Sequence, residues 1–119
     1  MMITLYTECF FDSAHFIESH PGKCANLHGH TWKVGVWVKG DSELRDKTGI
    51  LWDFGNLKTI TEDLDHKNLN NILSDNPTAE NIAMYIYSEC KKNATRLSFK
   101  VRVYESIISK TSFCETGDF

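Results

Sequence analysis

The sequence predicts an α+β fold in which two helices cover one face of a four-stranded antiparallel sheet. Three segments alternate apolar and polar residues with a period of two, which is typical of strands that bury one face, and a short fourth strand is expected near the end of the chain. Two central segments instead repeat apolar residues at helical spacing. Because the helices follow one another between two pairs of strands, the order favours an antiparallel sheet. The 119 residues are enough for a single domain, residues 1–119.

Each of the first three expected strands places apolar residues at alternate positions. The rows are Ile3, Leu5, Cys9 and Phe11; His30, Trp32, Val34, Val36 and Val38; and Leu97, Phe99, Val101 and Val103. The second row lies in the clearest strand, residues 29–39, and puts His30 on the face of the valines. A short final strand is expected over residues 111–114. The open edges of such a narrow sheet invite pairing with another copy, so we expect a closed homo-oligomer.

The two expected helices begin at residues that cap helices well. Asp53 is expected to cap the first helix and Thr78, directly after Pro77, the second. Their buried stripes are Phe54, Leu57, Ile60 and Leu64 in the first helix, and Ala79, Ile82, Ala83, Ile86 and Cys90 in the second. Turn-forming residues at 68–71 and 74–77 lie between them.

Composition narrows the possible functions. With 13 Lys and Arg against 16 Asp and Glu, the net charge is -3, so no basic field indicates nucleic acid or an anionic membrane as a partner. No apolar run reaches membrane-spanning length and the N-terminus does not resemble a signal peptide, so we expect a cytoplasmic protein. The four cysteines form no C-x-x-C pair and are expected to be free thiols.

Three histidines form the candidate metal site. His28 and His30 are two residues apart, so on a strand their rings face the same way, and a hairpin would bring His15 across from them. Three imidazoles would leave a zinc ion one open position, as in catalytic sites. Two other readings stay open: a surface pair that binds no metal, and a closed structural site with Cys24 as fourth ligand. His20, beside a Pro-Gly turn, is expected to be a bystander.

Two further groups are candidates for chemistry. Asp65 precedes His66 near the end of the first expected helix, and could orient that ring for proton transfer only if the backbone leaves helical geometry there. The alternative is a polar helix terminus in which the macrodipole favours a histidine. Glu105 continues the apolar row of its strand, so it either marks an exposed strand end or meets a ligand that donates hydrogen bonds.

Five ordered motifs resemble one known family. They are Cys24-x-x-x-His28-Gly-His30 with the upstream Ala14-His15, residues 53–58 (Asp-Phe-Gly-Asn-Leu-Lys), residues 64–70 (Leu-Asp-His-Lys-x-Leu-Asn), residues 77–81 (Pro-Thr-Ala-Glu-Asn), and Val103-x-Glu105. Together they resemble the 6-pyruvoyl-tetrahydropterin synthase and 6-carboxytetrahydropterin synthase family, over most of the chain.

The resemblance implies the tunnelling fold, in which sheets from several subunits join into a β-barrel. It implies a homo-oligomer, a hexamer built as a dimer of trimers, with active sites between subunits. It also implies specific roles for nine residues. These are zinc ligation by His15, His28 and His30, catalysis by Cys24, Asp65 and His66, and binding of the pterin by Glu105, Thr78 and Glu80.

The spacing within the first motif indicates a branch of the family. The three-residue gap between Cys24 and His28 resembles the bacterial 6-carboxy-5,6,7,8-tetrahydropterin synthases of queuosine precursor biosynthesis. These act on 7,8-dihydroneopterin triphosphate and release triphosphate and acetaldehyde. Retention of Cys24 argues against the relatives that lack this cysteine and act as aldolases. The alternatives are a 6-pyruvoyl-tetrahydropterin synthase and a zinc- or pterin-binding module without turnover.

Overall fold

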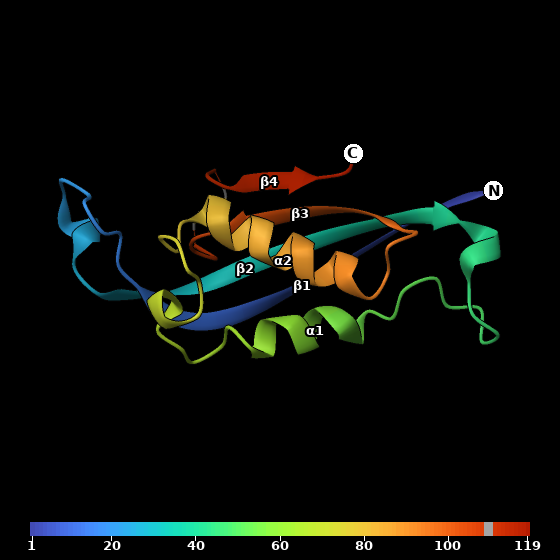
Figure 1. Cartoon of the computed structure of the whole chain (residues 1–119), viewed down its shortest axis with the longest axis horizontal. Coiled ribbons are helices and arrows are strands. Elements are labelled where there is room, and N and C mark those ends of the chain that lie inside the picture. The colour runs from blue at the N-terminus through green and yellow to red at the C-terminus, as the bar shows by residue number, and fades with distance from the viewer. Residues whose placement is uncertain (109–110) are drawn as a thin grey trace.

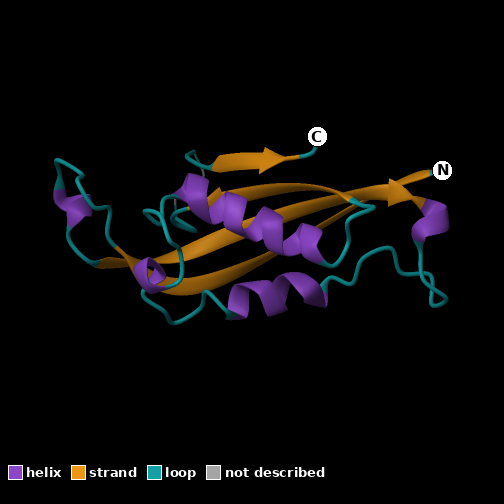
Figure 2. Ribbon diagram, in the orientation of Figure 1, coloured by secondary structure: helices purple, strands orange, loops and turns teal. Residues whose placement is uncertain are grey.

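The computed structural model describes residues 1–108 and 111–119, and it contains a four-stranded antiparallel sheet in the order β1-β2-β3-β4 (Figure 1). The strands are β1 (Met2–His15), β2 (His28–Asp41), β3 (Ser98–Tyr104) and β4 (Cys114–Gly117). Helices α1 (Gly55–Glu62) and α2 (Ala79–Lys92) lie side by side over the sheet (Figure 2). Short 3₁₀ helices cover Lys23–Ala25, Ser42–Leu44 and Leu69–Asn71. The predicted α+β architecture is confirmed.

The core lies between the sheet and the two helices. The alternating apolar residues of β2 and β3 point into it, together with the inner faces of α1 and α2. Its fully buried members include Trp32, Val34, Val36, Val38, Phe99, Val101, Val103, Ile82 and Ile86. Burial of one such aliphatic side chain contributes about 1.5–3 kcal/mol. This packing makes the sheet a rigid base for the residues at its ends.

Strands β1 and β2 form a long hairpin whose register decides the site. Phe11 lies opposite Trp32, Ser13 opposite His30 and His15 opposite His28. The connecting loop, residues 16–27, extends beyond the end of the sheet (Figure 1). The prediction that a hairpin would bring His15 across from the histidine pair is therefore confirmed.

The first helix begins later and ends earlier than predicted. The Asp53 carboxylate accepts a hydrogen bond from the Gly55 backbone N–H at 2.8 Å, which forms a turn ahead of the helix, and Phe54 is the N-cap. Phe54 is 53% exposed and does not join the core. Leu64 is fully buried as expected but lies beyond the end of the helix at Glu62.

The last strand also differs from the prediction, since it covers Cys114–Gly117 and not residues 111–114. Its position follows from pairing with β3 and from Asp118, whose carboxylate accepts a hydrogen bond from the Phe99 backbone N–H at 2.9 Å. Thr78 caps α2 as predicted: its hydroxyl accepts a hydrogen bond from the Asn81 N–H at 3.1 Å.

Strand β1 forms one edge of the sheet. Segment 65–68 runs along the last part of this edge, where the backbone N–H of Ala14 donates to the Lys67 carbonyl at 3.0 Å. The earlier part of β1 pairs with β2 on one side and, within residues 1–108 and 111–119, with no strand on the other. In that same described portion, no helix combines the length and apolar character needed to cross a membrane.

Candidate functional site

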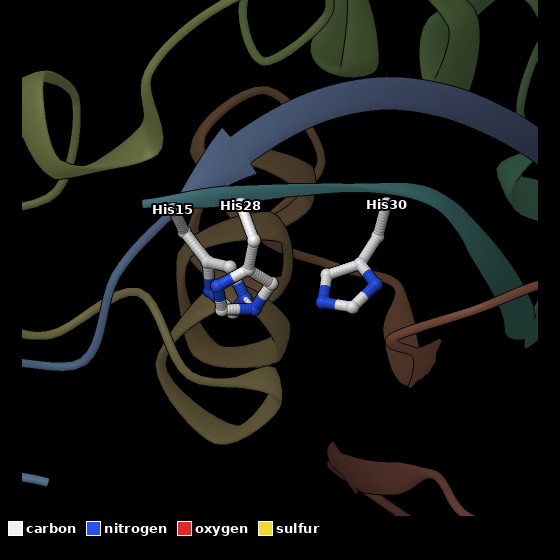
Figure 3. A group of neighbouring side chains, drawn as sticks. All are labelled: His15, His28 and His30. Atoms are coloured by element: carbon white, nitrogen blue, oxygen red, sulfur yellow. Dashed lines mark hydrogen bonds between the residues drawn. The ribbon is translucent and has the colours of Figure 1, made fainter. Parts of the chain in front are cut away.

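The rings of His15, His28 and His30 converge at the end of the β1–β2 hairpin (Figure 3). One nitrogen from each ring lies within 4.8 Å of one nitrogen from each of the others, and the Nε2 atoms of His15 and His28 are 3.1 Å apart. In a tetrahedral zinc site, bonds of about 2.0–2.1 Å would separate two ligand nitrogens by roughly 3.4 Å. The His15–His28 spacing of 3.1 Å is close to this value, and the other two pairs of nitrogens lie within 4.8 Å.

Backbone carbonyls orient two of these rings. Nδ1 of His15 lies 2.7 Å from the Pro77 carbonyl oxygen, and Nδ1 of His28 lies 2.7 Å from that of Asn26. A carbonyl can only accept, so each neutral ring carries its proton on Nδ1 and turns the lone pair of Nε2 toward the other ring. Two lone pairs 3.1 Å apart cannot form a hydrogen bond, but they can share a cation.

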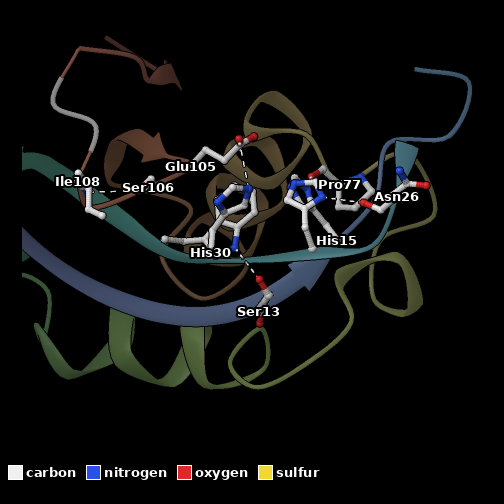
Figure 4. Close-up of polar contacts among 10 residues, drawn as sticks. Ser13, His15, Asn26, His30, Pro77, Glu105, Ser106 and Ile108 are labelled. Carbon is white, nitrogen blue, oxygen red and sulfur yellow. Dashed lines mark hydrogen bonds and ion pairs between the residues drawn. The ribbon is translucent and has the colours of Figure 1, made fainter. Parts of the chain in front are cut away.

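His30 adds a third donor to the same space. Its Nε2 is buried without a hydrogen-bond partner among the described residues, although Oε1 of Glu105 lies 3.3 Å away (Figure 4). The direction of this contact does not suit a hydrogen bond, so the lone pair of Nε2 stays available to a cation. Burial lowers the pKa of His15 and His30, which keeps both rings neutral. The three nitrogens therefore fit zinc or a similar divalent ion.

Cys24 does not belong to this ligand group. It lies half-buried in the 3₁₀ helix Lys23–Ala25, and its carbonyl oxygen accepts a hydrogen bond from the Ile17 N–H at 2.8 Å. Among the described residues, the candidate metal-ligand group here consists of His15, His28 and His30 and does not include Cys24. The geometry therefore favours a metal site with an open position over a closed four-ligand site. His20 lies exposed in the same loop, outside the group.

Asp65 and His66 form a pair on the turn that follows α1. Oδ2 of Asp65 lies 2.8 Å from Nδ1 of His66, and His66 has φ +56°, outside helical geometry. The prediction that the pairing requires the backbone to leave the helix is confirmed. Asp65 also accepts the Asp12 N–H at 2.8 Å, and this bond and His66 lower the pKa of its carboxyl group.

Ser13 supports the same turn from the buried face of β1. Its hydroxyl donates to the Leu64 carbonyl and accepts a hydrogen bond from the Lys67 N–H at 3.2 Å, so it joins the two ends of the turn. Ser13 was not among the residues predicted from the sequence. A small polar residue in the apolar phase of β1, between Phe11 and His15, was the available signal.

A cavity of about 420 Å³ adjoins the three histidines through Glu105. It is lined by Ala79, Glu80, Glu105, Ser112, Phe113 and Cys114. Two carboxylates beside an aromatic ring suit a flat ligand that presents several N–H donors. Glu80 and Glu105, to which the family resemblance gave pterin-binding roles, lie here, whereas the sequence pattern gave no sign of Ser112, Phe113 and Cys114. Thr78 is not among the lining residues, and its hydroxyl caps α2.

Comparison with known proteins gives consistent matches. A family profile described as 6-pyruvoyl tetrahydropterin synthase matches residues 4–116. The 6-carboxy-5,6,7,8-tetrahydropterin synthase of Synechocystis sp. is 32% identical over 120 residues, covering 94% of this chain and 93% of that protein. The dihydroneopterin monophosphate aldolase of Pyrococcus furiosus is 41% identical over 87 residues, 70% of each chain. The solved structure of Caenorhabditis elegans 6-pyruvoyl tetrahydropterin synthase has a TM-score of 0.74 at 24% identity, covering 100% of this chain and 97% of that one.

Proposed function

Because the chain belongs to the 6-pyruvoyl tetrahydropterin synthase family, we propose that it is a zinc-dependent 6-carboxy-5,6,7,8-tetrahydropterin synthase. In this proposal, residues 1–119 form one domain that converts 7,8-dihydroneopterin triphosphate and water to 6-carboxytetrahydropterin, triphosphate and acetaldehyde. The observation that carries the proposal is the convergence of three histidine nitrogens next to a cavity lined by two glutamates. The similarity to a named 6-carboxytetrahydropterin synthase over nearly the whole chain supports this branch.

His15, His28 and His30 would hold the zinc ion. When bound, zinc would supply a Lewis acid for the oxygens of the substrate side chain, which makes the neighbouring C–H and O–H groups more acidic. The chain's own contribution is orientation: Pro77 and Asn26 hold two of the rings with Nε2 toward the site.

Cys24 and His66 would move protons. Cys24 lies in a loop and outside the ligand group, a position from which its thiol would reach the substrate as a base. Asp65 holds a proton on Nδ1 of His66, which leaves Nε2 of that ring to accept or return one. The ring of His66 is exposed, so substrate can reach it from outside this chain.

Glu105 and Glu80 would bind the pterin ring. Their carboxylates can accept hydrogen bonds from the 2-amino group and the adjacent ring N–H, and Phe113 offers an aromatic wall. Because Glu105 also lies beside His30, a ring anchored there would place its side chain next to the zinc site.

The proposed reaction is tested by incubating zinc-loaded protein with 7,8-dihydroneopterin triphosphate and identifying the products by mass spectrometry. We expect 6-carboxytetrahydropterin together with equal amounts of triphosphate and acetaldehyde. Formation of 6-pyruvoyl-tetrahydropterin would instead support the other synthase branch. Tight pterin binding without any product would support the binding module.

Replacing Glu105 by glutamine should weaken the binding of a non-reactive pterin such as biopterin. Glutamine keeps the size but replaces one acceptor oxygen by a donor, and loss of a charge-assisted hydrogen bond costs about 1.5–3 kcal/mol, or roughly one to two decades in affinity. Titration calorimetry would measure the loss, with the exposed Glu43→Gln as matched control. Wild-type affinity in Glu105→Gln, at full zinc content, would show that Glu105 is only a strand end.

We also propose that active sites are completed by a neighbouring copy in a closed oligomer. The Asp65–His66 pair lies outside the three-histidine group, and much of the outer edge of β1 is open to a strand from another copy. In the proposed assembly, a hexamer formed as a dimer of trimers, the sheets would join into a barrel and bring the pair of one subunit to the zinc site of the next.

Mixing two inactive variants tests this arrangement. Cys24→Ala chains and His66→Ala chains, allowed to exchange subunits, should recover part of the activity, because some interfaces would then combine an intact cysteine with an intact histidine. Native mass spectrometry would verify the exchange. Exchange without recovery would mean that each chain holds its complete site.

A further inference from the structure

We propose that Asn70 and Asn76 are positioning residues that clamp the Cys24 loop to segment 69–77, whose Pro77 orients a metal-site histidine. Residues 16–27 leave the end of the hairpin and form the outlying loop of Figure 1. A base on such a loop must be held in a fixed position relative to the reacting atoms. The inference rests on the proposed function only in giving Cys24 a role in proton transfer.

The first half of the clamp is Asn70, in the 3₁₀ helix Leu69–Asn71. Its Oδ1 accepts the Phe16 N–H at 2.9 Å, and its Nδ2 donates to the Phe16 carbonyl at 2.9 Å. One side-chain amide thus satisfies both backbone groups of a residue that has just left β1. The Asn70 side chain thus pairs with the Phe16 backbone as a neighbouring strand would, one residue beyond the end of β1.

The second half is Asn76, which repeats this pattern two residues further along the loop. Its Oδ1 accepts the Glu18 N–H and its Nδ2 donates to the Glu18 carbonyl, both at 3.0 Å. Ile17, between the two clamped residues, donates its N–H to the Cys24 carbonyl at 2.8 Å. The two asparagines therefore fix the backbone on both sides of Ile17, and Ile17 in turn hydrogen-bonds Cys24.

The other hydrogen bonds of the loop are mostly local. The His20 N–H donates to the Ile17 carbonyl, the Ala25 N–H to Gly22 and the Asn26 N–H to Lys23. Such bonds shape the loop but do not tie it to the domain. The Asn26 carbonyl is a further tie, to the His28 ring at the start of β2. Among the hydrogen bonds of the described residues, those of the two asparagines tie the first half of the loop to the domain.

Asn76 also connects the loop to the histidine group. The next residue, Pro77, accepts the hydrogen bond that orients His15, and the Asn76 carbonyl accepts from the Asn81 side chain at 2.8 Å. The segment that orients a metal-site histidine therefore also anchors the cysteine loop. In Asn76→Asp, the carboxylate would still accept from the Glu18 N–H, but it would turn an oxygen toward the Glu18 carbonyl, so the change disrupts one specific contact.

Limited proteolysis of the zinc-loaded full chain tests the clamp. Lys23 is exposed next to Cys24, so trypsin cleavage after Lys23 reports loosening of the loop. In Asn76→Asp and Asn70→Asp we expect cleavage about tenfold faster, because proteolysis follows the population of the open form. The matched control is Asn93→Asp, an exposed position whose side chain makes no hydrogen bond to the rest of the described chain. Wild-type cleavage rates in both variants would overturn the proposal.

Kinetics separate positioning from a merely structural role. In Asn76→Asp we expect kcat to fall roughly ten- to a hundred-fold with KM within threefold, since misplacing a catalytic group costs that order of rate. Zinc content and the visible spectrum of the cobalt-substituted protein should match wild type. Faster cleavage with unchanged kcat, or loss of metal, would overturn the positioning role. If wild-type protein does not turn over the pterin triphosphate, the proposed function fails, and the cleavage rates still decide whether the clamp exists.

Discussion

Replacing His28 or His30 by alanine is expected to remove zinc and activity together. Each change leaves two nitrogen ligands. Removing a residue that only hydrogen-bonds a ligand lowers metal affinity roughly 10–100-fold, and removing the ligand itself should lower it further. His15 is already one of the two remaining ligands, with its ring held by the Pro77 carbonyl, so it cannot also supply the missing nitrogen. Metal analysis after dialysis would measure the loss.

The matched control for this prediction is His20→Ala, because His20 is exposed in the loop and outside the ligand group. It should retain full zinc. Full zinc occupancy in both His28→Ala and His30→Ala would show that the three rings are not the metal site.

The same site predicts how zinc binding changes with pH. Protons compete with the metal for Nε2, and burial lowers the pKa of His15 and His30. These rings therefore stay neutral to a lower pH than exposed histidines, and zinc should be released only on stronger acidification. Metal analysis at graded pH would measure the pH at which half of the zinc is released. A midpoint above the pH range in which exposed histidines titrate would contradict neutral, buried ligands.

Replacing Cys24 by alanine should abolish turnover and leave zinc in place. A positioned general base contributes typically about 10²–10⁴-fold to rate, so the rate of product formation should fall at least about 10²-fold. Zinc should stay because the thiol lies outside the three-histidine group. Product assays and metal analysis on one preparation would measure both effects.

Cys9→Ala provides the comparison for Cys24→Ala. Cys9 is half-buried beside Thr61, and burial raises the pKa of its thiol, so it should behave as a small core residue. Its variant should keep both zinc and activity. If Cys24→Ala lost zinc as well as activity, the closed structural site would be the correct account of this region.

Local periodicity explains how much of this molecule could be predicted from sequence. The alternation of β2 placed His28 and His30 on the face of the buried valines, and the register of the hairpin then brought His15 to them. These relations depend on strand phase, which neighbouring residues determine. The order of elements likewise followed from periods of two and 3.6 residues.

The remaining features depend on contacts that leave no periodic signal. Asp12 and Asp65 are far apart in sequence, and their contact joins a backbone N–H to a side chain. The same holds for Ser13 and for the asparagine clamp, whose partners meet only when segment 64–76 folds against the end of β1. Asp53 was misplaced because one aspartate can start either a helix or the turn that precedes it.

The central claim is that three histidines hold a zinc ion with one position open for substrate. X-ray absorption at the zinc edge, on the zinc-loaded and substrate-free protein, tests this most directly. We predict imidazole nitrogens and one further light atom at about 2.0–2.1 Å, with no sulfur. A sulfur atom at about 2.3 Å would place Cys24 on the metal and contradict the open site.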